Sequence, residues 1–142
     1  KFAQLQMTLA QANKEKALEY MDQITASQQE AKLCAQMIAK ARELQNGLTG
    51  NTCSEMPADM VNFFNSRGIS FDHTGNDNLH KKEEWDYNIQ SLQNYQETIG
   101  TETQQKMVFV QDFMGQYNSY LTGSNSAIQQ SNQTLQSIAR GQ

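Results

Sequence analysis

The fold is decided by the stretch MVFVQDFMGQYNSYL at residues 107–121. Its apolar side chains recur at steps of three and four residues, which places them on one face of an α-helix. The members of this stripe are Met107, Val110, Met114, Tyr117 and Leu121. The same spacing starts at Trp85 and continues to Ile138. We therefore expect a long helix over residues 79–142 that is capped by Asp77 or Asn78, with a kink or break at Gly100-Thr101.

A second long helix is predicted at the other end of the chain, over residues 1–46. Its stripe is expected to begin with Phe2, Leu5, Leu9 and Ala12, and to resume after a stutter with Ala17, Met21, Ile24, Ala31, Cys34, Ile38 and Ala41. Asn46-Gly47 is a typical helix end. Two long helices in one chain predict an all-α fold, a long antiparallel helical hairpin that pairs as a coiled coil.

Residues 47–78 differ in character from both helices because glycine and asparagine interrupt them repeatedly. Within this insertion the sequence from Pro57 to Phe64 predicts a short helix, with Ser54 as its N-cap and Gly68 as its end. We expect residues 1–142 to form a single elongated domain, in which the small irregular insertion packs against the hairpin.

Bulk composition agrees with a coiled coil and excludes some classes of partner. Apolar residues make up 37% of the chain, which is low for a compact globule but suits a fold that buries only a stripe. Charged residues make up 18%, the net charge is −4, and basic residues cluster only at Lys81-Lys82. Nucleic acid is therefore not an expected partner.

The second helix carries more apolar surface than one partner helix covers. Phe109, Phe113 and Tyr120 form a stripe beside the first, and the two stripes together span roughly 160° of the helix. Either Phe63, Phe64 and Phe71 of the insertion cover this stripe, or another molecule does. The polar tail beyond residue 123 also needs a neighbour. The expected self-assembly interface is Phe109, Phe113, Tyr120, Ile128, Leu135 and Ile138.

Motifs of catalysis or cofactor binding are not evident. Asp72, Thr74, Asn76 and Glu83 partly imitate a calcium loop, but its sixth position holds Asp77 instead of glycine. His73 and His80 with Asp77 could in principle bind a transition metal. Turn and capping roles are the expectation for this loop, and Cys34 and Cys53 are expected to be free thiols. We expect a protein that is not an enzyme and has no catalytic, cofactor or metal site.

Four segments resemble one known family. They are the Gln/Glu/Lys/Ala-rich helix that starts at Lys1-Phe2, the Met56–Phe64 segment MPADMVNFF, the Gly68–Asp72 segment GISFD, and the long helix around Glu102–Met107. Together they resemble the filament and needle-tip proteins of bacterial type III secretion systems, especially the EspA/SseB filament group. Pro57 and its surroundings are the most specific element of this resemblance.

The resemblance implies a structural role in virulence-associated protein transport. Proteins of this group are secreted to the bacterial cell surface after a cytoplasmic stage in which a secretion chaperone binds them. They assemble as homo-oligomers on the needle subunit and form a filament or tip through which translocator and effector proteins pass. An intracellular coiled-coil adaptor or export chaperone is the alternative that the helices alone leave open.

Overall fold

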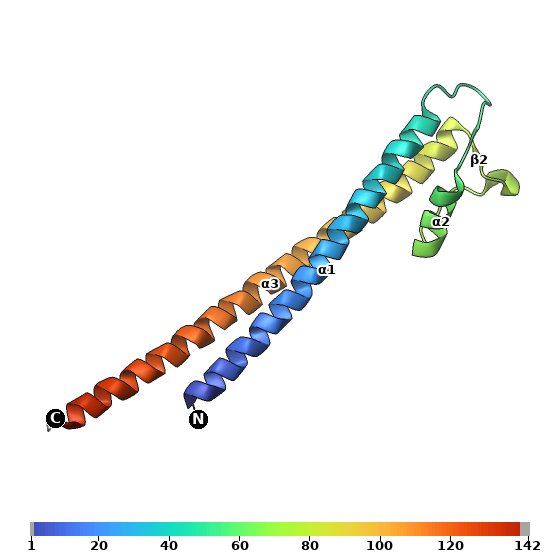
Figure 1. Ribbon diagram of the computed structural model, residues 1–142. Helices are drawn as coiled ribbons and strands as arrows, with labels where there is room; N and C mark the ends of the chain where they lie inside the picture. The colour runs from blue at the N-terminus through green and yellow to red at the C-terminus, as the bar shows by residue number, and fades with distance from the viewer. Residues whose placement is uncertain (1, 140–142) are drawn as a thin grey trace. The chain divides into compact units, whose positions relative to one another are not determined.

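The computed structural model describes the backbone of residues 2–139 and the side chains of residues 2–123. Its elements follow the order α1 (Phe2–Gln45), β1 (Ser54–Glu55), α2 (Ala58–Arg67), a 3₁₀ turn (Thr74–Asn76), β2 (Leu79–His80) and α3 (Lys82–Ala139) (Figure 1). The helices α1 and α3 pack against each other, and the segment between them holds a short helix and two short strands. The predicted all-α hairpin with a small insertion is confirmed.

The helix α1 ends where the sequence predicts. Gln45 is its last residue, and Gly47 follows with a φ of 84°, a left-handed conformation that glycine adopts without strain. Its buried face, however, differs from the predicted stripe. Buried and half-buried positions run from Ala3 to Ala41 in continuous steps of three and four. The helix therefore has no stutter, and Phe2, Leu5, Leu9 and Ala12 lie on its exposed side.

The helix α3 begins three residues later than predicted and does not break at Gly100. Leu79 and His80 instead form β2, which pairs antiparallel with Ser54 and Glu55 of β1. Asp77 is not the helix cap, because its Oδ1 accepts the N–H of Leu79 at 3.1 Å. The side chain that caps the N-terminus of α3 is Glu84, whose Oε1 accepts the Lys81 N–H at 2.8 Å.

The short helix α2 begins directly after Pro57, whose fixed φ of −61° suits a helix entry. Ser54 is not its cap. The Ser54 hydroxyl donates to the Leu44 carbonyl at 2.5 Å and accepts the Trp85 Nε1–H at 3.0 Å, which ties β1 to α1 and α3. The helix ends at Gly68 as predicted, with a φ of 66° and a bond from Ile69 N–H to the Phe64 carbonyl.

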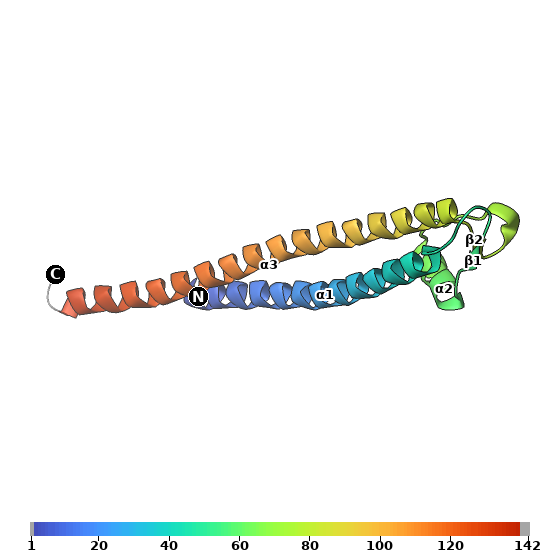
Figure 2. The same ribbon diagram turned by 90° about the horizontal axis from the view of Figure 1, so that it is seen from above.

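The chain forms two compact units, which we treat separately. The first unit comprises Lys1–Thr25 and Gln104–Gln142, and the second comprises Ala26–Thr103. The second unit has a hydrophobic core. Figure 2 shows α2, β1 and β2 beside the parts of α1 and α3 that belong to this unit. Its largest buried side chains are Trp85, Phe63, Phe64, Met56, Met60 and Leu92. Among the described residues of the first unit, only the apolar side chains of Ala10 and Ala17 are buried.

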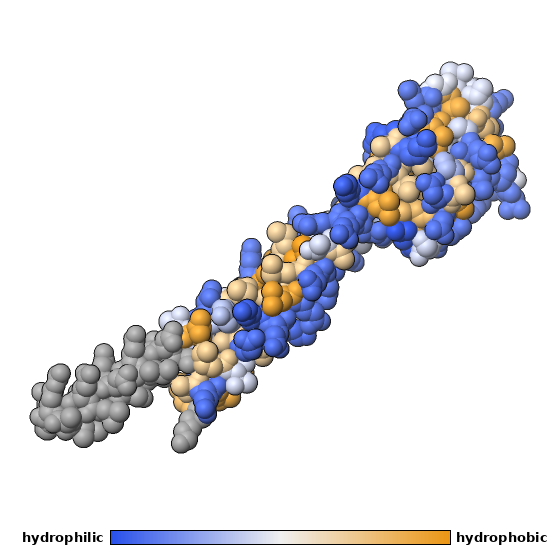
Figure 3. Space-filling view, viewed as in Figure 1, coloured by the Kyte–Doolittle hydropathy of each residue, from blue (hydrophilic) through white to orange (hydrophobic). Residues whose placement is uncertain are grey.

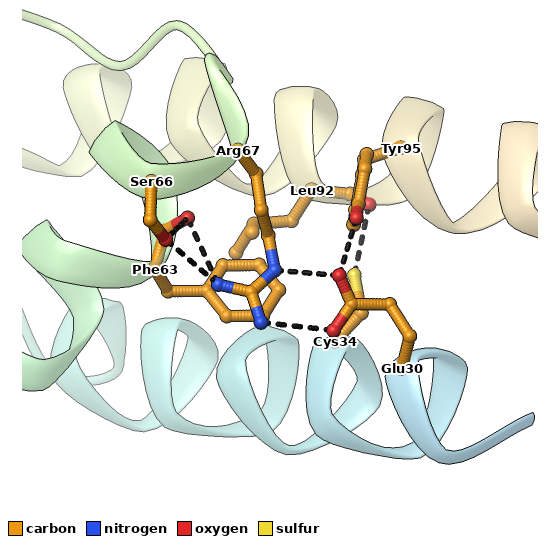
Figure 4. Close-up of polar contacts among 7 residues, drawn as sticks. All are labelled: Glu30, Cys34, Phe63, Ser66, Arg67, Leu92 and Tyr95. Atoms are coloured by element: carbon orange, nitrogen blue, oxygen red, sulfur yellow. Dashed lines mark hydrogen bonds and ion pairs between the residues drawn. The ribbon is translucent and has the colours of Figure 1, made fainter. Parts of the chain in front are cut away.

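A polar cluster fastens α2 within the second unit (Figure 4). The Arg67 guanidinium donates from Nε and Nη2 to the two oxygens of the Glu30 carboxylate, at 2.6 and 2.9 Å. It also lies 3.8 Å from the centroid of the Phe63 ring, and the Tyr95 hydroxyl donates to the Glu30 Oε2 atom. The hydrogen bond from Arg67 holds the pKa of Glu30 below its ordinary value. One carboxylate therefore joins α1, α2 and α3.

Candidate assembly surface

Large apolar side chains lie exposed on both helices of the first unit, each between 37% and 61% accessible. We call this set the assembly surface. It consists of Phe2, Leu5, Met7, Leu9, Leu18 and Met21 on α1, and Met107, Val108 and Phe109 on α3. Figure 3 shows apolar surface open to solvent over the described part of this unit. Single exposed apolar residues are ordinary, but a concentration of nine on one small unit is typical of an interaction surface.

The register of α1 explains why these side chains face outward. The buried Ala10 and Ala17 alternate along the helix with the half-buried Ala3, Gln6 and Asn13. Up to Ala17, α1 therefore turns only small or polar groups inward, and Tyr20 and Ile24 are the first large side chains on this face. The neighbouring Leu5, Leu9 and Leu18 are exposed. Burial of alanine removes little apolar area from water. The hairpin of this unit consequently buries only small side chains completely and leaves its large ones half-buried or exposed.

The α3 side of the first unit is only partly covered. Val110, Phe113 and Tyr117 are half-buried, whereas Phe109 is 43% exposed. The ring of Tyr20 on α1 lies 5.3 Å from the Phe109 centroid and 5.9 Å from the Phe113 centroid, and it stacks on the latter. One tyrosine therefore shields parts of two phenylalanines and completely covers neither of them.

An open apolar groove of about 290 Å³ lies between the two helices of this unit. Its lining residues are Met21, Ile24, Thr25, Met107, Val110 and Gln111. Met21 and Met107, one from each helix, line this groove and belong to the assembly surface. Methionine is flexible and adapts to partners of different shape, so this groove can receive a side chain from another helix.

The predicted interface residues have different outcomes. Phe109 is exposed, while Phe113 and Tyr120 are half-buried. Ile128, Leu135 and Ile138 lie outside the residues whose side chains the structure describes. The phenylalanines of the insertion, Phe63, Phe64 and Phe71, are buried in the core of the second unit.

Most of the assembly surface was missed by sequence reasoning, because the outward stripe on α1 was assigned to the hairpin core. One signal could have revealed it. The steps of three and four through Cys34, Ile38 and Ala41, extended backward without a stutter, lead to Ala17, Ala10 and Ala3. This register leaves Phe2, Leu5 and Leu9 outside.

Charge does not oppose association of one first unit with another. The sequence of this unit contains five lysine or arginine residues and four aspartate or glutamate residues. Its formal charge is therefore close to zero, although the whole chain carries −4. Like-charge repulsion between copies is weak under these conditions.

The loop that partly imitates a calcium site is built mainly from turns. Asp72 Oδ1 accepts the Thr74 N–H at 2.8 Å, and residues 74–76 form a 3₁₀ turn. Burial lowers the pKa of His80 below its ordinary value, against the raising effect of the Glu84, Asp72 and Asp77 charges, while the His73 charge lowers it further. The ring of His80 is neutral at pH 7 as a result.

Comparison of the chain with protein-family models, curated proteins and solved structures gave no match. Within the described residues, no helix combines the length and the apolar character needed to cross a membrane.

Proposed function

We propose that this chain is a structural subunit that assembles with copies of itself through the assembly surface of its first unit. One observation carries the proposal: the two helices of this unit enclose Ala10 and Ala17 and leave nine large apolar side chains in water. Apolar stripes at steps of three and four are the surfaces that helices bury against other helices. A further helix pair would cover what the hairpin leaves open.

In its concrete form, the subunit builds an extracellular filament or needle tip of a type III secretion system, a conduit for translocator and effector delivery. The resemblance of the Met56–Phe64 segment and of both long helices to the EspA/SseB filament group supports this form. A secretion chaperone would cover the same surface before export, since an unassembled subunit with this much exposed apolar area is prone to aggregate.

A second copy is the favoured occupant of the surface for two reasons. Both helices of the first unit present outward apolar side chains, so the apolar face of one helix can pack on the other helix of the next copy, a head-to-tail contact that leaves a face free for a further copy. The near balance of charge in this unit adds no barrier to such pairing. A hetero-partner would have to supply a surface that the chain itself already possesses.

The test compares assembly of the wild type with that of surface variants, by sedimentation velocity and by electron microscopy of the same samples. Leu5→Glu/Leu9→Glu and Val108→Glu place charges on the assembly surface at exposed helix positions, where glutamate is a good helix former. Tyr87→Glu is the matched control, because Tyr87 is an exposed apolar residue of α3 in the second unit.

We expect concentration-dependent rods or filaments for the wild type and for Tyr87→Glu. Monomers with a folded second unit are expected for the surface variants. A wild type that stays monomeric at every concentration and shows no rods would contradict the proposal. Assembly that survives all the surface substitutions would contradict it equally.

The intracellular adaptor or export chaperone remains the second candidate. The same surface favours it, because two copies that cover each other completely would form a closed dimer instead of a polymer. This candidate predicts a dimer of fixed size at all concentrations and retention of the protein inside the cell. Secretion of the intact chain that depends on a type III apparatus would exclude it.

A further inference from the structure

Three side chains with metal-ligand chemistry converge in the second unit, far in sequence from the assembly surface. Asp72 follows α2, His80 belongs to β2, and Glu84 lies in the first turn of α3. One ligand atom from each of them lies within 4.8 Å of the others. Three separate segments therefore bring one imidazole and two carboxylates to a common point.

The imidazole of this group is fully buried and lacks a hydrogen-bond partner. His80 is 0% exposed, and among the described residues neither Nδ1 nor Nε2 has a partner. Its ring lies edge-on to Trp85 at 5.1 Å and to Phe71 at 6.2 Å, so apolar groups fix its orientation. A buried polar nitrogen without a partner is costly, and such a group calls for a ligand.

The two carboxylates are held in position by the backbone around them. The N–H of Asp72 donates to Oδ1 of the buried Asn88 at 2.7 Å, which fixes the Asp72 backbone against α3. The Lys81 N–H in turn holds Oε1 of Glu84. Two carboxylates held this close repel each other, and a cation between them removes that repulsion.

We propose that Asp72, His80 and Glu84 bind a divalent transition-metal ion of the zinc type. An imidazole nitrogen with carboxylate oxygens is a common ligand set for zinc, and three protein ligands leave a fourth position for water. Zinc would draw the ligand atoms to about 3.3 Å from one another, which requires the separations between them, now within 4.8 Å, to shorten by up to about 1.5 Å. Calcium fits less well, because it takes six to eight oxygen ligands.

This site differs from both arrangements considered from the sequence. The calcium pattern shares Asp72 with the cluster but used Glu83, which is exposed and absent from it. The histidine pattern shares His80 but combined it with His73 and Asp77. Glu84 could not be chosen in advance, since the choice between adjacent glutamates depends on the residue at which α3 begins. The expectation of no metal site is replaced by this proposal.

The test is a calorimetric titration of the full chain with zinc chloride, repeated with Asp72→Asn, Glu84→Gln and the control Glu83→Gln. Both ligand variants keep an oxygen that can accept the Thr74 or Lys81 N–H, so they are expected to fold. We expect one zinc ion per wild-type chain, an affinity more than about 100-fold weaker in each ligand variant, and an affinity within about twofold of wild type in Glu83→Gln.

Thermal unfolding followed by circular dichroism supplies a second readout. Saturating zinc is expected to raise the melting temperature of the wild type and of Glu83→Gln by at least about 5 °C, and to leave both ligand variants unchanged. The proposal is overturned if the wild type binds no zinc saturably. It is also overturned if folded Asp72→Asn and Glu84→Gln bind zinc as tightly as wild type, which is the result expected if the exposed Cys53 thiol were the ligand. A loss of zinc binding in Glu83→Gln as large as in the two ligand variants would overturn it as well.

Discussion

At the scale of single residues, Glu30 joins three helices of the second unit through one carboxylate. Arg67 of α2 and Tyr95 of α3 both donate to it, and the Glu30 and Arg67 side chains are only 26% and 22% exposed. Charge-assisted bonds of this kind are stronger than exposed ion pairs. Burial and the bond to Glu30 raise the pKa of Tyr95 to about 12, so its hydroxyl remains a donor at neutral pH.

Replacement of Glu30 with glutamine is expected to lower the free energy of unfolding by about 2 kcal/mol at pH 7. The pKa of Glu30 is lowered in the folded chain, so between the folded and the unfolded pKa the unfolded state binds more protons. The free energy of unfolding therefore decreases as the pH is lowered through this range. The difference between wild type and Glu30→Gln should therefore shrink as pH drops below 4.5, the ordinary value. Urea unfolding across pH measures it.

Glu43→Gln is the control for this prediction, since Glu43 pairs with Lys40 in an ion pair that is exposed on both sides. We expect Glu43→Gln to match the wild type within about 0.5 kcal/mol. Equal effects of the two substitutions, or a Glu30 effect that persists in acid, would show that the cluster does not fasten the helices.

The two cysteines are expected to differ strongly in reactivity. Cys34 is fully buried and its Sγ donates to the Leu92 carbonyl, and burial raises the pKa of its thiol to about 11. Cys53 is exposed. Since the thiolate is the reactive form and is only about 0.1% of Cys34 at pH 8, a disulfide reagent should label one thiol per native chain and two in denaturant. Rapid labelling of Cys34 in the folded protein would contradict the described packing.

At the scale of elements, the glycines of the second unit divide into two kinds. Gly68 ends α2 with a φ of 66°, which a side chain tolerates poorly. Gly100 lies inside α3, and a Cβ added there would meet nothing within 4 Å. No packing contact within the chain therefore requires glycine at position 100, and glycine has a lower helix propensity than alanine there.

Gly100→Ala is expected to raise the free energy of unfolding by about 1 kcal/mol, and Gly68→Ala to lower it by about the same amount. Thermal unfolding of both variants beside the wild type checks the opposite signs. A destabilising Gly100→Ala would mean that α3 needs flexibility at this point, as the predicted kink required.

The sequence predicted the elements better than it predicted their faces. The end of α1 and the start of α2 depend on Gly47 and Pro57, whose local conformations are visible in the sequence. The start of α3 depends on Leu79 and His80 pairing with Ser54 and Glu55, which is a tertiary contact. The buried face at the start of α1 was predicted wrongly, because leucines and alanines offered two stripes on one helix.

At the scale of the whole molecule, the two units differ in what stabilises them. The second unit encloses aromatic and aliphatic side chains and a shared carboxylate. Among its described residues the first unit completely buries only two alanines and half-buries its larger apolar side chains, so its two helices gain less from their own contact, and an isolated hairpin of this kind is marginal in water. Assembly would supply the missing burial and stabilise the first unit by mass action.

Sequence reasoning found that the chain carries more apolar surface than one hairpin covers, and it named Phe109 within that surface. It could not locate the rest, since the position of Phe2, Leu5 and Leu9 depends on the register between α1 and α3. It named Asp72 and His80 in two separate patterns but did not combine them with Glu84, because the burial of His80 depends on its tertiary contacts with Trp85 and Phe71.

Backbone hydrogen exchange measured over a wide range of protein concentration tests the central claim most directly. We predict that protection of residues 2–25 and 104–123 rises as the concentration rises, while protection of residues 26–103 stays constant. Val108→Glu should remove the rise. Protection of the first unit that is independent of concentration in the wild type, or a rise confined to the second unit, would contradict the account.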